Sequence, residues 1–97
     1  MLRISEQEMS ARSATLRLEG QLVGAWIEAL RETCERVLGE GRALTLDLAD
    51  VSLIERPGVA LLADLASRGA ALAHCSPFQE EEIKRAAPPS PLTSLRP

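Results

Sequence analysis

Residues 42–65, RALTLDLADVSLIERPGVALLADL, change from one hydrophobic period to another within a single stretch. Over residues 44–49, leucines alternate with Thr, Asp and Ala, which is typical of a strand with one face against a core. After a turn at residues 54–59, apolar residues recur at intervals of three and four, as on one face of a helix. The helical positions are Val59, Leu62, Leu65 and Ala66. The stretch therefore predicts a strand that passes through a compact turn into an amphipathic helix.

The turn between this strand and helix has the composition of a helix entrance. Pro57 suits the first helical position, because its missing N–H would have no partner there. Gly58 has no side chain, so we expect the helix entrance to be open to approach from outside. A negative charge at Glu55 is favoured by the positive end of the helix, and we expect Asp50 to support the turn after the strand.

The same stretch resembles the central segment of STAS domains, the fold of bacterial anti-sigma factor antagonists. In that family a hydrophobic strand ends in an acidic residue followed by Ser-Ser-Gly or Ser-Thr-Gly, and an apolar helix comes next. This chain reads ERPG at residues 55–58, so Pro57, which has no hydroxyl, stands where classical members carry the phosphorylated serine. Together with Gly20 and the CSPF sequence at residues 75–78, the resemblance covers residues 14–86.

This resemblance implies a small α/β domain. We expect a mixed sheet of four or five strands with an N-terminal antiparallel hairpin, packed by three helices in the STAS manner. It also implies a non-enzymatic interaction module that binds a sigma-regulating kinase or a transporter ATPase, without a serine phosphoswitch. The alternative within binding modules is an accessory subunit of a lipid-transport ABC ATPase, and a homodimer stays open.

The predicted contact surface combines two turns that follow parallel strands, because the carboxyl ends of such strands meet at one edge of the sheet. The second turn follows the hairpin. The residues expected to bind the partner are Gln21, Leu22, Glu55, Arg56, Pro57, Gly58 and Val59.

Composition limits the alternatives. Hydrophobic residues make up 45% of the 97 positions but aromatic residues only 2%, so the core is expected to be aliphatic, with Trp26 and Phe78 as its only large rings. A net charge of −3 with interspersed signs offers no basic field for nucleic acid. The apolar runs are shorter than the ~20 residues that span a bilayer, and the N-terminus has no secretory core. We therefore expect a soluble cytoplasmic protein without membrane insertion.

The N-terminal half predicts a hairpin followed by a long helix. Weak alternation over residues 2–9 suits an edge strand, and clearer alternation over residues 14–19 suits its partner, which Gly20 is expected to end. The helix that follows carries one apolar and one charged face and ends at Gly39 and Gly41. Its expected buried stripe is Val23, Trp26, Ile27, Leu30, Cys34, Val37 and Leu38.

The C-terminal part predicts a short parallel strand, a helix and a tail. The apolar run at residues 70–75 lies between two helices, which favours a strand. Ser76 and Gln79 have the spacing of a capping box for a helix over residues 77–86. Four prolines interrupt residues 87–97, so we assign residues 1–86 to the domain and expect an irregular proline-rich tail.

No arrangement of side chains predicts catalysis, a metal or a cofactor. His74 and Cys75 are adjacent on a predicted strand and would point to opposite faces, so they cannot form a base–thiol pair. The two cysteines, Cys34 and Cys75, lack metal-ligand spacing and are expected to be buried thiols. A phosphate at the amides of Gly58 and Val59, or acid–base work by Asp50 and Glu55, are weaker alternatives.

Overall fold

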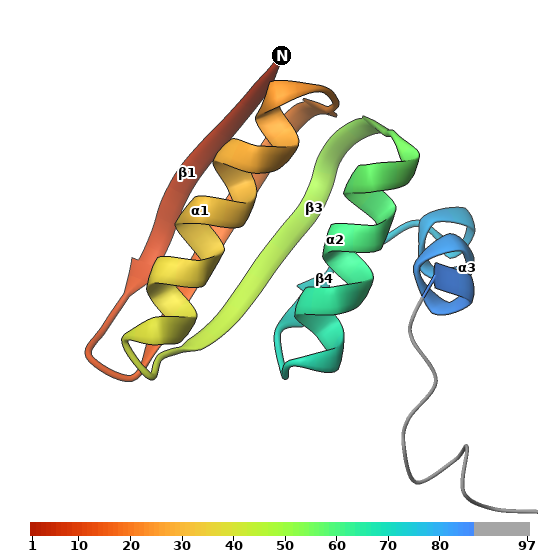
Figure 1. Ribbon diagram of the computed structural model, residues 1–97. Coiled ribbons are helices and arrows are strands. Elements are labelled where there is room, and N and C mark those ends of the chain that lie inside the picture. Colours follow the sequence, from red (N-terminus) through yellow and green to blue (C-terminus); the bar gives the residue numbers. More distant parts are fainter. Residues whose placement is uncertain (87–97) are drawn as a thin grey trace, which may run out of the picture.

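The computed structural model describes residues 1–86, which form one sheet and three helices (Figure 1). The tail predicted over residues 87–97 lies outside the described residues. The elements are β1 (Leu2–Met9), β2 (Ser13–Leu22), α1 (Ala25–Gly39), β3 (Ala43–Ile54), α2 (Arg56–Ser67), β4 (Ala71–Ala73) and α3 (Pro77–Ala86).

The sheet has the strand order β1-β2-β3-β4 and mixes both directions of pairing. Strand β1 is antiparallel to β2, which confirms the predicted hairpin, whereas β2, β3 and β4 are parallel. Leu16 pairs with Leu46, and Leu46 pairs with Leu72, so the alternating leucines of neighbouring strands share one face. The predicted mixed α/β sheet is confirmed, with four strands.

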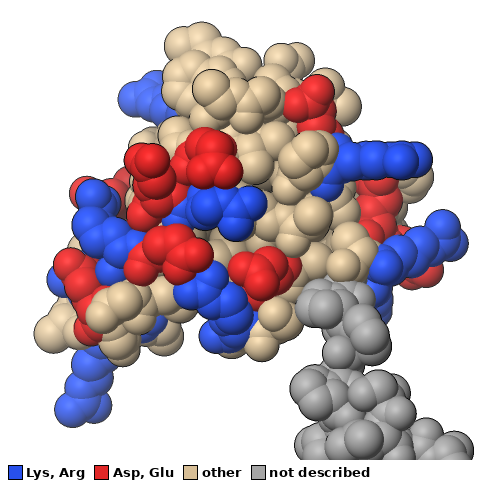
Figure 2. Space-filling model, in the orientation of Figure 1, with Lys and Arg blue, Asp and Glu red and all other residues tan. Residues whose placement is uncertain are grey.

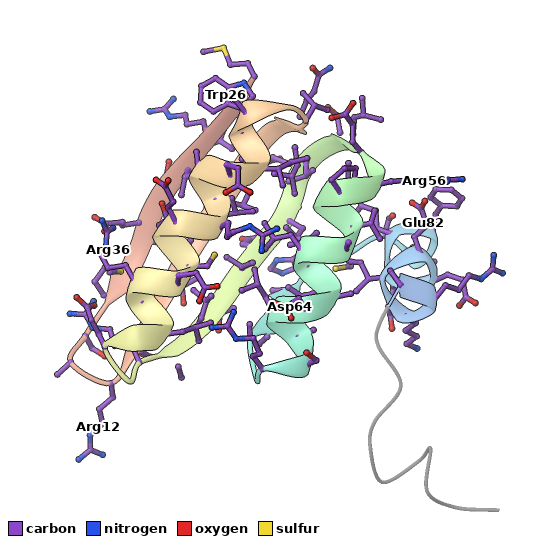
Figure 3. The ribbon with its side chains drawn as sticks, viewed as in Figure 1. Arg12, Trp26, Arg36, Arg56, Asp64 and Glu82 are labelled. Carbon is purple, nitrogen blue, oxygen red and sulfur yellow. The ribbon has the colours of Figure 1, made fainter. Side chains whose placement is uncertain are left out.

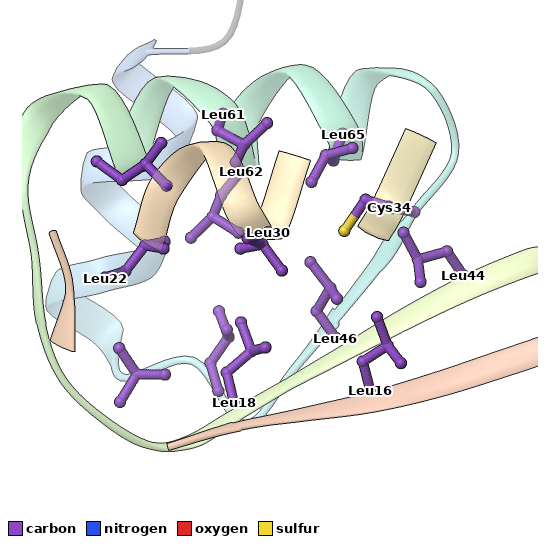
Figure 4. Packing of buried hydrophobic residues seen from close by; sticks show 14 of the residues in the cluster. Leu16, Leu18, Leu22, Leu30, Cys34, Leu44, Leu46, Leu61, Leu62 and Leu65 are labelled. Atoms are coloured by element: carbon purple, nitrogen blue, oxygen red, sulfur yellow. The ribbon is translucent and has the colours of Figure 1, made fainter. Parts of the chain in front are cut away.

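Helices α1 and α2 cover the leucine face of this sheet, and α3 lies beside α2 (Figure 1). The buried cluster contains leucines of β2, β3, α1 and α2, together with Cys34 of α1 (Figure 4). The alternate strand residues point to the opposite face and stay partly exposed, among them Thr15, Arg17, Thr45 and Asp47. This one-sided burial explains why β2 and β3 alternate instead of being continuously apolar.

The core contains no aromatic ring among residues 1–86. Trp26 is 40% exposed and Phe78 is 73% exposed, so the prediction that these rings belong to the core is wrong. Each is the second residue of its helix, in α1 and α3 respectively. The spacing that assigned Trp26 to the buried stripe holds, but the first turn of α1 extends past the leucine cluster.

Strand β2 does not end at Gly20, as the sequence suggested, but continues to Leu22. Gly20 has a φ of 106°, and a side chain there would collide with the carbonyl of Met1. The pairing of β2 with β3 shifts register on both sides of this glycine. Gly20 is therefore an irregularity within the strand, which only glycine readily allows.

Helix α3 begins with the predicted capping box. The Gln79 N–H donates to Ser76 Oγ at 3.1 Å, and the Ser76 N–H donates to Gln79 Oε1 at 3.2 Å. Gln79 Nε2 also donates to the carbonyl of Val51 in β3 at 3.3 Å. One side chain therefore both caps α3 and attaches it to the sheet, beyond the point where the short β4 ends.

Strand β4 is shorter than the predicted run of residues 70–75, because His74 adopts a φ of 61°. Between α1 and α2, Arg68 Nη2 donates to Glu35 Oε1 at 2.6 Å, and this bond lowers the pKa of Glu35. Within α1, Arg31 Nε lies 3.1 Å from Glu28 Oε1.

Candidate functional site

Two turns meet at one end of the molecule, as the parallel strands require. The turn from β2 to α1 and the turn from β3 to α2 lie side by side at the top of Figure 1. The Glu55 N–H donates to the carbonyl of Leu22 at 3.1 Å, and the Gly24 N–H donates to Glu55 Oε1 at 2.8 Å. Two hydrogen bonds therefore join the turns directly.

Glu55 has a structural role in this junction. It is the N-terminal flanking residue of α2, yet its side chain makes no capping hydrogen bond to that helix. Its carboxylate instead accepts the N–H of Gly24, the corresponding flanking residue of α1. The negative charge thus lies at the start of the neighbouring helix, where the helix dipole favours it.

Arg56 and Pro57 open α2 and are both exposed. Pro57 is the second helical residue instead of the predicted first, a position that still needs no intrahelical N–H partner. Arg56 has no ion pair within 4.0 Å among residues 1–86, and Figure 3 shows its side chain extending away from the helix. Gln21, the second-last residue of β2, is also exposed.

Three other predicted site residues face inward. Leu22, Gly58 and Val59 are buried. A Cβ on Gly58 would lie 3.0 Å from both Leu22 Cγ and Ile54 Cγ2, so the glycine lets α2 pack closely on the two strand ends. The expectation that Gly58 leaves the helix entrance open is wrong, since the space beside it is filled by the protein's own side chains.

Asp50 differs from expectation. It lies within β3 and pairs with Arg17 of β2, instead of supporting the turn. That contact raises the pKa of Arg17. Ser52, also in β3, is exposed, and its Oγ donates to the carbonyl of Gly20 at 3.2 Å.

Exposed large hydrophobic side chains concentrate at this same end, which the sequence reasoning missed. Five are exposed among the described residues: Met1, Met9, Trp26, Leu53 and Phe78. All but Met9 belong to the end formed by the two turns. The carbonyl of Met1 accepts the Gln21 N–H at 2.7 Å, and Leu53 is the partner of Gln21 in the pairing of β2 with β3. The Trp26 N–H donates to the carbonyl of Val23, just after β2.

Figure 2 shows that charged side chains are sparse where the exposed hydrophobic side chains concentrate. Acidic and basic side chains interleave over the lower part of this face, whereas the upper tip carries mainly other residues. Contiguous apolar surface on a small domain marks a contact site more often than isolated exposed leucines do. Alternation did not reveal this surface, because Val51 and Leu53 alternate with Ser52 as two core residues would, and yet Leu53 is 50% exposed.

Two shallow hollows border the start of α2. One of about 220 Å³ is lined by residues from the end of β3 and the start of α3: Ser52, Leu53, Ile54, Phe78, Gln79 and Glu82. The other, of about 480 Å³, lies between α2 and α3 and is lined by Arg56, Val59, Glu82, Arg85 and Ala86. Glu82 lines both, so the two hollows adjoin.

His74 and Cys75, which the sequence excludes as a base–thiol pair, border one hollow but differ in their other contacts. His74 Nδ1 lies 3.0 Å from Asp47 Oδ1 on the helix-free side of the sheet. Two hydrogen bonds lower the pKa of Asp47: the one from the Ala49 N–H has the larger effect, and the one with His74 has the smaller. Cys75 lines a third hollow of about 400 Å³, and burial raises the pKa of its thiol, which is opposite to the shift that activates a nucleophile.

No helix among residues 1–86 combines the length and apolar character needed to cross a membrane. Within the same residues no three His, Cys, Asp or Glu side chains gather as a metal site would require.

Comparison with solved structures shows the same fold in two proteins. The anti-sigma factor antagonist SpoIIAA in its unphosphorylated form superposes with a TM-score of 0.69 at 17% identity, over 88% of this chain and 84% of that one. An uncharacterized protein of the DUF3478 family from Shewanella loihica, described as having a SpoIIAA-like fold, gives 0.54 at 13% identity, over 88% and 75%.

Comparison with curated proteins gives no match. Comparison with protein families shows that residues 5–80 match the family described as "Mlab, STAS domain". That range includes most of the hairpin, both turns and the start of α3. The chain therefore belongs to the STAS domain family.

Proposed function

We propose that this STAS domain is a non-enzymatic interaction module that binds a regulatory protein through the end formed by its two turns. The observation that carries the proposal is the gathering of exposed hydrophobic side chains at this end: Trp26 at the start of α1, Leu53 at the end of β3 and Phe78 at the start of α3. The exposed Arg56 and Pro57 open α2 at the same end. Aromatic and arginine side chains are the residue types enriched at protein interfaces.

The first candidate is a cytoplasmic module of the anti-sigma factor antagonist type, whose partner is a sigma-regulating kinase. The fold shared with SpoIIAA, whose name describes such an antagonist, supports this candidate. Pro57 offers no hydroxyl at the position where classical members are phosphorylated, so the proposed module lacks that switch.

The second candidate is an accessory subunit of a lipid-transport ATPase. Pro57 favours it, because a subunit that holds a permanent partner needs no phosphate acceptor at the contact surface. Both candidates place the contact at the same end of the domain. They differ in the identity of the protein bound there.

Co-purification from the native host, with a charge reversal at the proposed surface, tests the proposal. Arg56→Asp places a carboxylate opposite the carboxylate that the partner is expected to carry. Like-charge contact at an interface costs several kcal/mol of binding free energy. Arg12→Asp is the matched control, since Arg12 is exposed at the opposite end of the molecule (Figure 3). Mass spectrometry of the bound fraction identifies the partner.

We expect Arg12→Asp to retain a kinase or a transporter ATPase and Arg56→Asp to lose it, while both proteins melt like the wild type. Leu46→Ala calibrates the effect of unfolding, because removing a fully buried leucine side chain costs ~2–5 kcal/mol. Undiminished binding by a folded Arg56→Asp protein would exclude this end of the domain as the contact surface.

A further inference from the structure

We infer that the contact surface extends from the two turns onto α3, where Phe78 and Leu53 form its apolar anchor. This inference rests on the proposed function. It specifies the partner by chemistry: a protein surface with an aliphatic or aromatic side chain next to a carboxylate, which meets Arg56, and a cation, which meets Glu82.

Phe78 has the exposure of a contact residue. It is the chain's only phenylalanine, and 73% of its surface is accessible. Leu53, 50% exposed, lines the same hollow of about 220 Å³ from the end of β3. An incoming apolar side chain would therefore touch two elements that are distant in the sequence.

The position of Phe78 is fixed by its neighbour in the chain. Gln79 caps α3 through Ser76 and donates to the carbonyl of Val51 at 3.3 Å. Val51 is two residues before Leu53, so the same hydrogen bond holds Phe78 beside Leu53. While α3 is docked on the sheet, this bond keeps the start of the helix, and with it Phe78, next to Leu53.

The charges around the anchor define what can bind. Arg85 has a partner, Glu81, at 3.5 Å. Arg56 and Glu82 line the same hollow of about 480 Å³, and neither has an ion pair within 4.0 Å among residues 1–86. A guanidinium and a carboxylate thus lie in the hollow that adjoins the one lined by Phe78 and Leu53. A complementary surface must carry the opposite charges there.

Site-specific photo-crosslinking in the native host tests this arrangement. The probe is p-benzoylphenylalanine, incorporated in separate full-length proteins in place of Phe78, Pro57 or Met9. Pro57 reports the surface of the proposed function, Phe78 reports its extension, and Met9 is a control, being 42% exposed at the far end of β1. We expect positions 57 and 78 to capture one and the same protein and position 9 to capture none.

Each other result has a defined meaning. Capture at position 57 without position 78 overturns the inference and leaves the proposed function standing. Capture at neither position, or equal capture at all three, overturns both. A crosslinked dimer of this chain through position 78 shows that a second copy occupies the anchor, which also overturns the inference.

The captured protein then allows a quantitative test with purified components. Truncation of an anchor residue costs about 2 kcal/mol or more, so we expect Phe78→Ala to weaken binding at least about thirtyfold. Met9→Ala, an equally mild change at an exposed site, should leave the affinity unchanged. If Phe78→Ala melts like the wild type and binds as tightly, Phe78 is not an anchor.

Discussion

The carboxylate of Glu55 accepts the backbone N–H of Gly24, 31 positions earlier in the chain, at 2.8 Å. Glu55, which precedes α2, thereby holds in place Gly24, which precedes α1. Gly24 has a φ of 56°, so a side chain at that position would be strained. The junction depends on an acceptor at one position and a glycine at the other.

Removal of this acceptor should loosen the junction. We expect Glu55→Ala to lower the free energy of unfolding by about 0.5–1.5 kcal/mol, the usual net contribution of one hydrogen bond. Glu55→Gln keeps a carbonyl oxygen that can accept the same N–H and should retain most of the stability. Urea unfolding of the three proteins gives the answer, and equal losses in both variants would show that the charge matters and the hydrogen bond does not.

Addition of one methyl group at Gly58 should destabilise the fold. Alanine is preferred over glycine inside a helix by about 1 kcal/mol, but overpacking a core costs about 1–3 kcal/mol. Leu22, whose Cγ would lie 3.0 Å away, is fully buried and has little room to move. We therefore expect a net loss for Gly58→Ala in urea unfolding.

Gly39→Ala provides the matched control for this prediction. Gly39 is the last residue of α1, and no atom lies within 4 Å of a Cβ built there. The same methyl group should be neutral or mildly stabilising. A Gly58→Ala protein as stable as Gly39→Ala would mean that Leu22 and Ile54 yield at no cost.

Gln79 should control how firmly α3 is held. Gln79→Glu keeps the acceptor for the Ser76 N–H but removes the donor to Val51, whereas Gln79→Ala removes both. We expect amide hydrogen exchange in α3 to accelerate in both variants, more in Gln79→Ala, while α1 is unaffected. Unchanged exchange in Gln79→Glu would show that the bond to Val51 does not anchor the helix.

The two thiols should differ in reactivity. Burial raises the pKa of the Cys34 thiol to about 12, and Cys34 is completely inaccessible, whereas Cys75 is partly exposed. At pH 8 we expect iodoacetamide to add at most one label to the native protein, on Cys75, and two labels in denaturant. Rapid double labelling of the native protein, seen by intact mass, would contradict the burial of Cys34.

Acid should weaken the tie between α1 and α2. The hydrogen bond from Arg68 lowers the pKa of Glu35 below its ordinary value of 4.5, so its stabilising effect is complete above that pH. The effect is lost as the pH falls through the lower pKa of the folded state. We expect Glu35→Gln to melt below the wild type at pH 7 and the difference to vanish in strong acid. A difference that persists at low pH would assign it to packing.

Hydrophobic period predicted the individual strands and helices of this fold, and the resemblance to STAS domains supplied their arrangement. The alternating leucines of β2 and β3 and the helical spacing in α1 and α2 each indicate one buried face, and burial on one face sets strand register. The hydrophobic period could not show where the end of a helix extends beyond the sheet that it covers. Trp26 has the spacing of a core residue and lies beyond the core.

The candidate site depends on contacts between distant residues, which local patterns do not encode. A glycine has the same appearance in a sequence whether it is open or crowded, and Gly58 proved to be crowded. Glu55 suggested a local helix charge, but its partner is a backbone N–H in another turn. Phe78 was assigned to the core only because aromatic side chains are usually buried.

Helix α3 is attached to the rest of the molecule by few interactions. It follows a strand of three residues, and Ile83 is its one buried residue among those described. Segments with little buried surface open at low free energy, so we expect α3 to detach from the sheet more readily than α1 or α2. If Phe78 is an anchor, a bound protein must hold α3 in place. Binding and docking of α3 are then coupled, so any change that raises the docked fraction of α3 tightens binding, even at positions that the partner never touches.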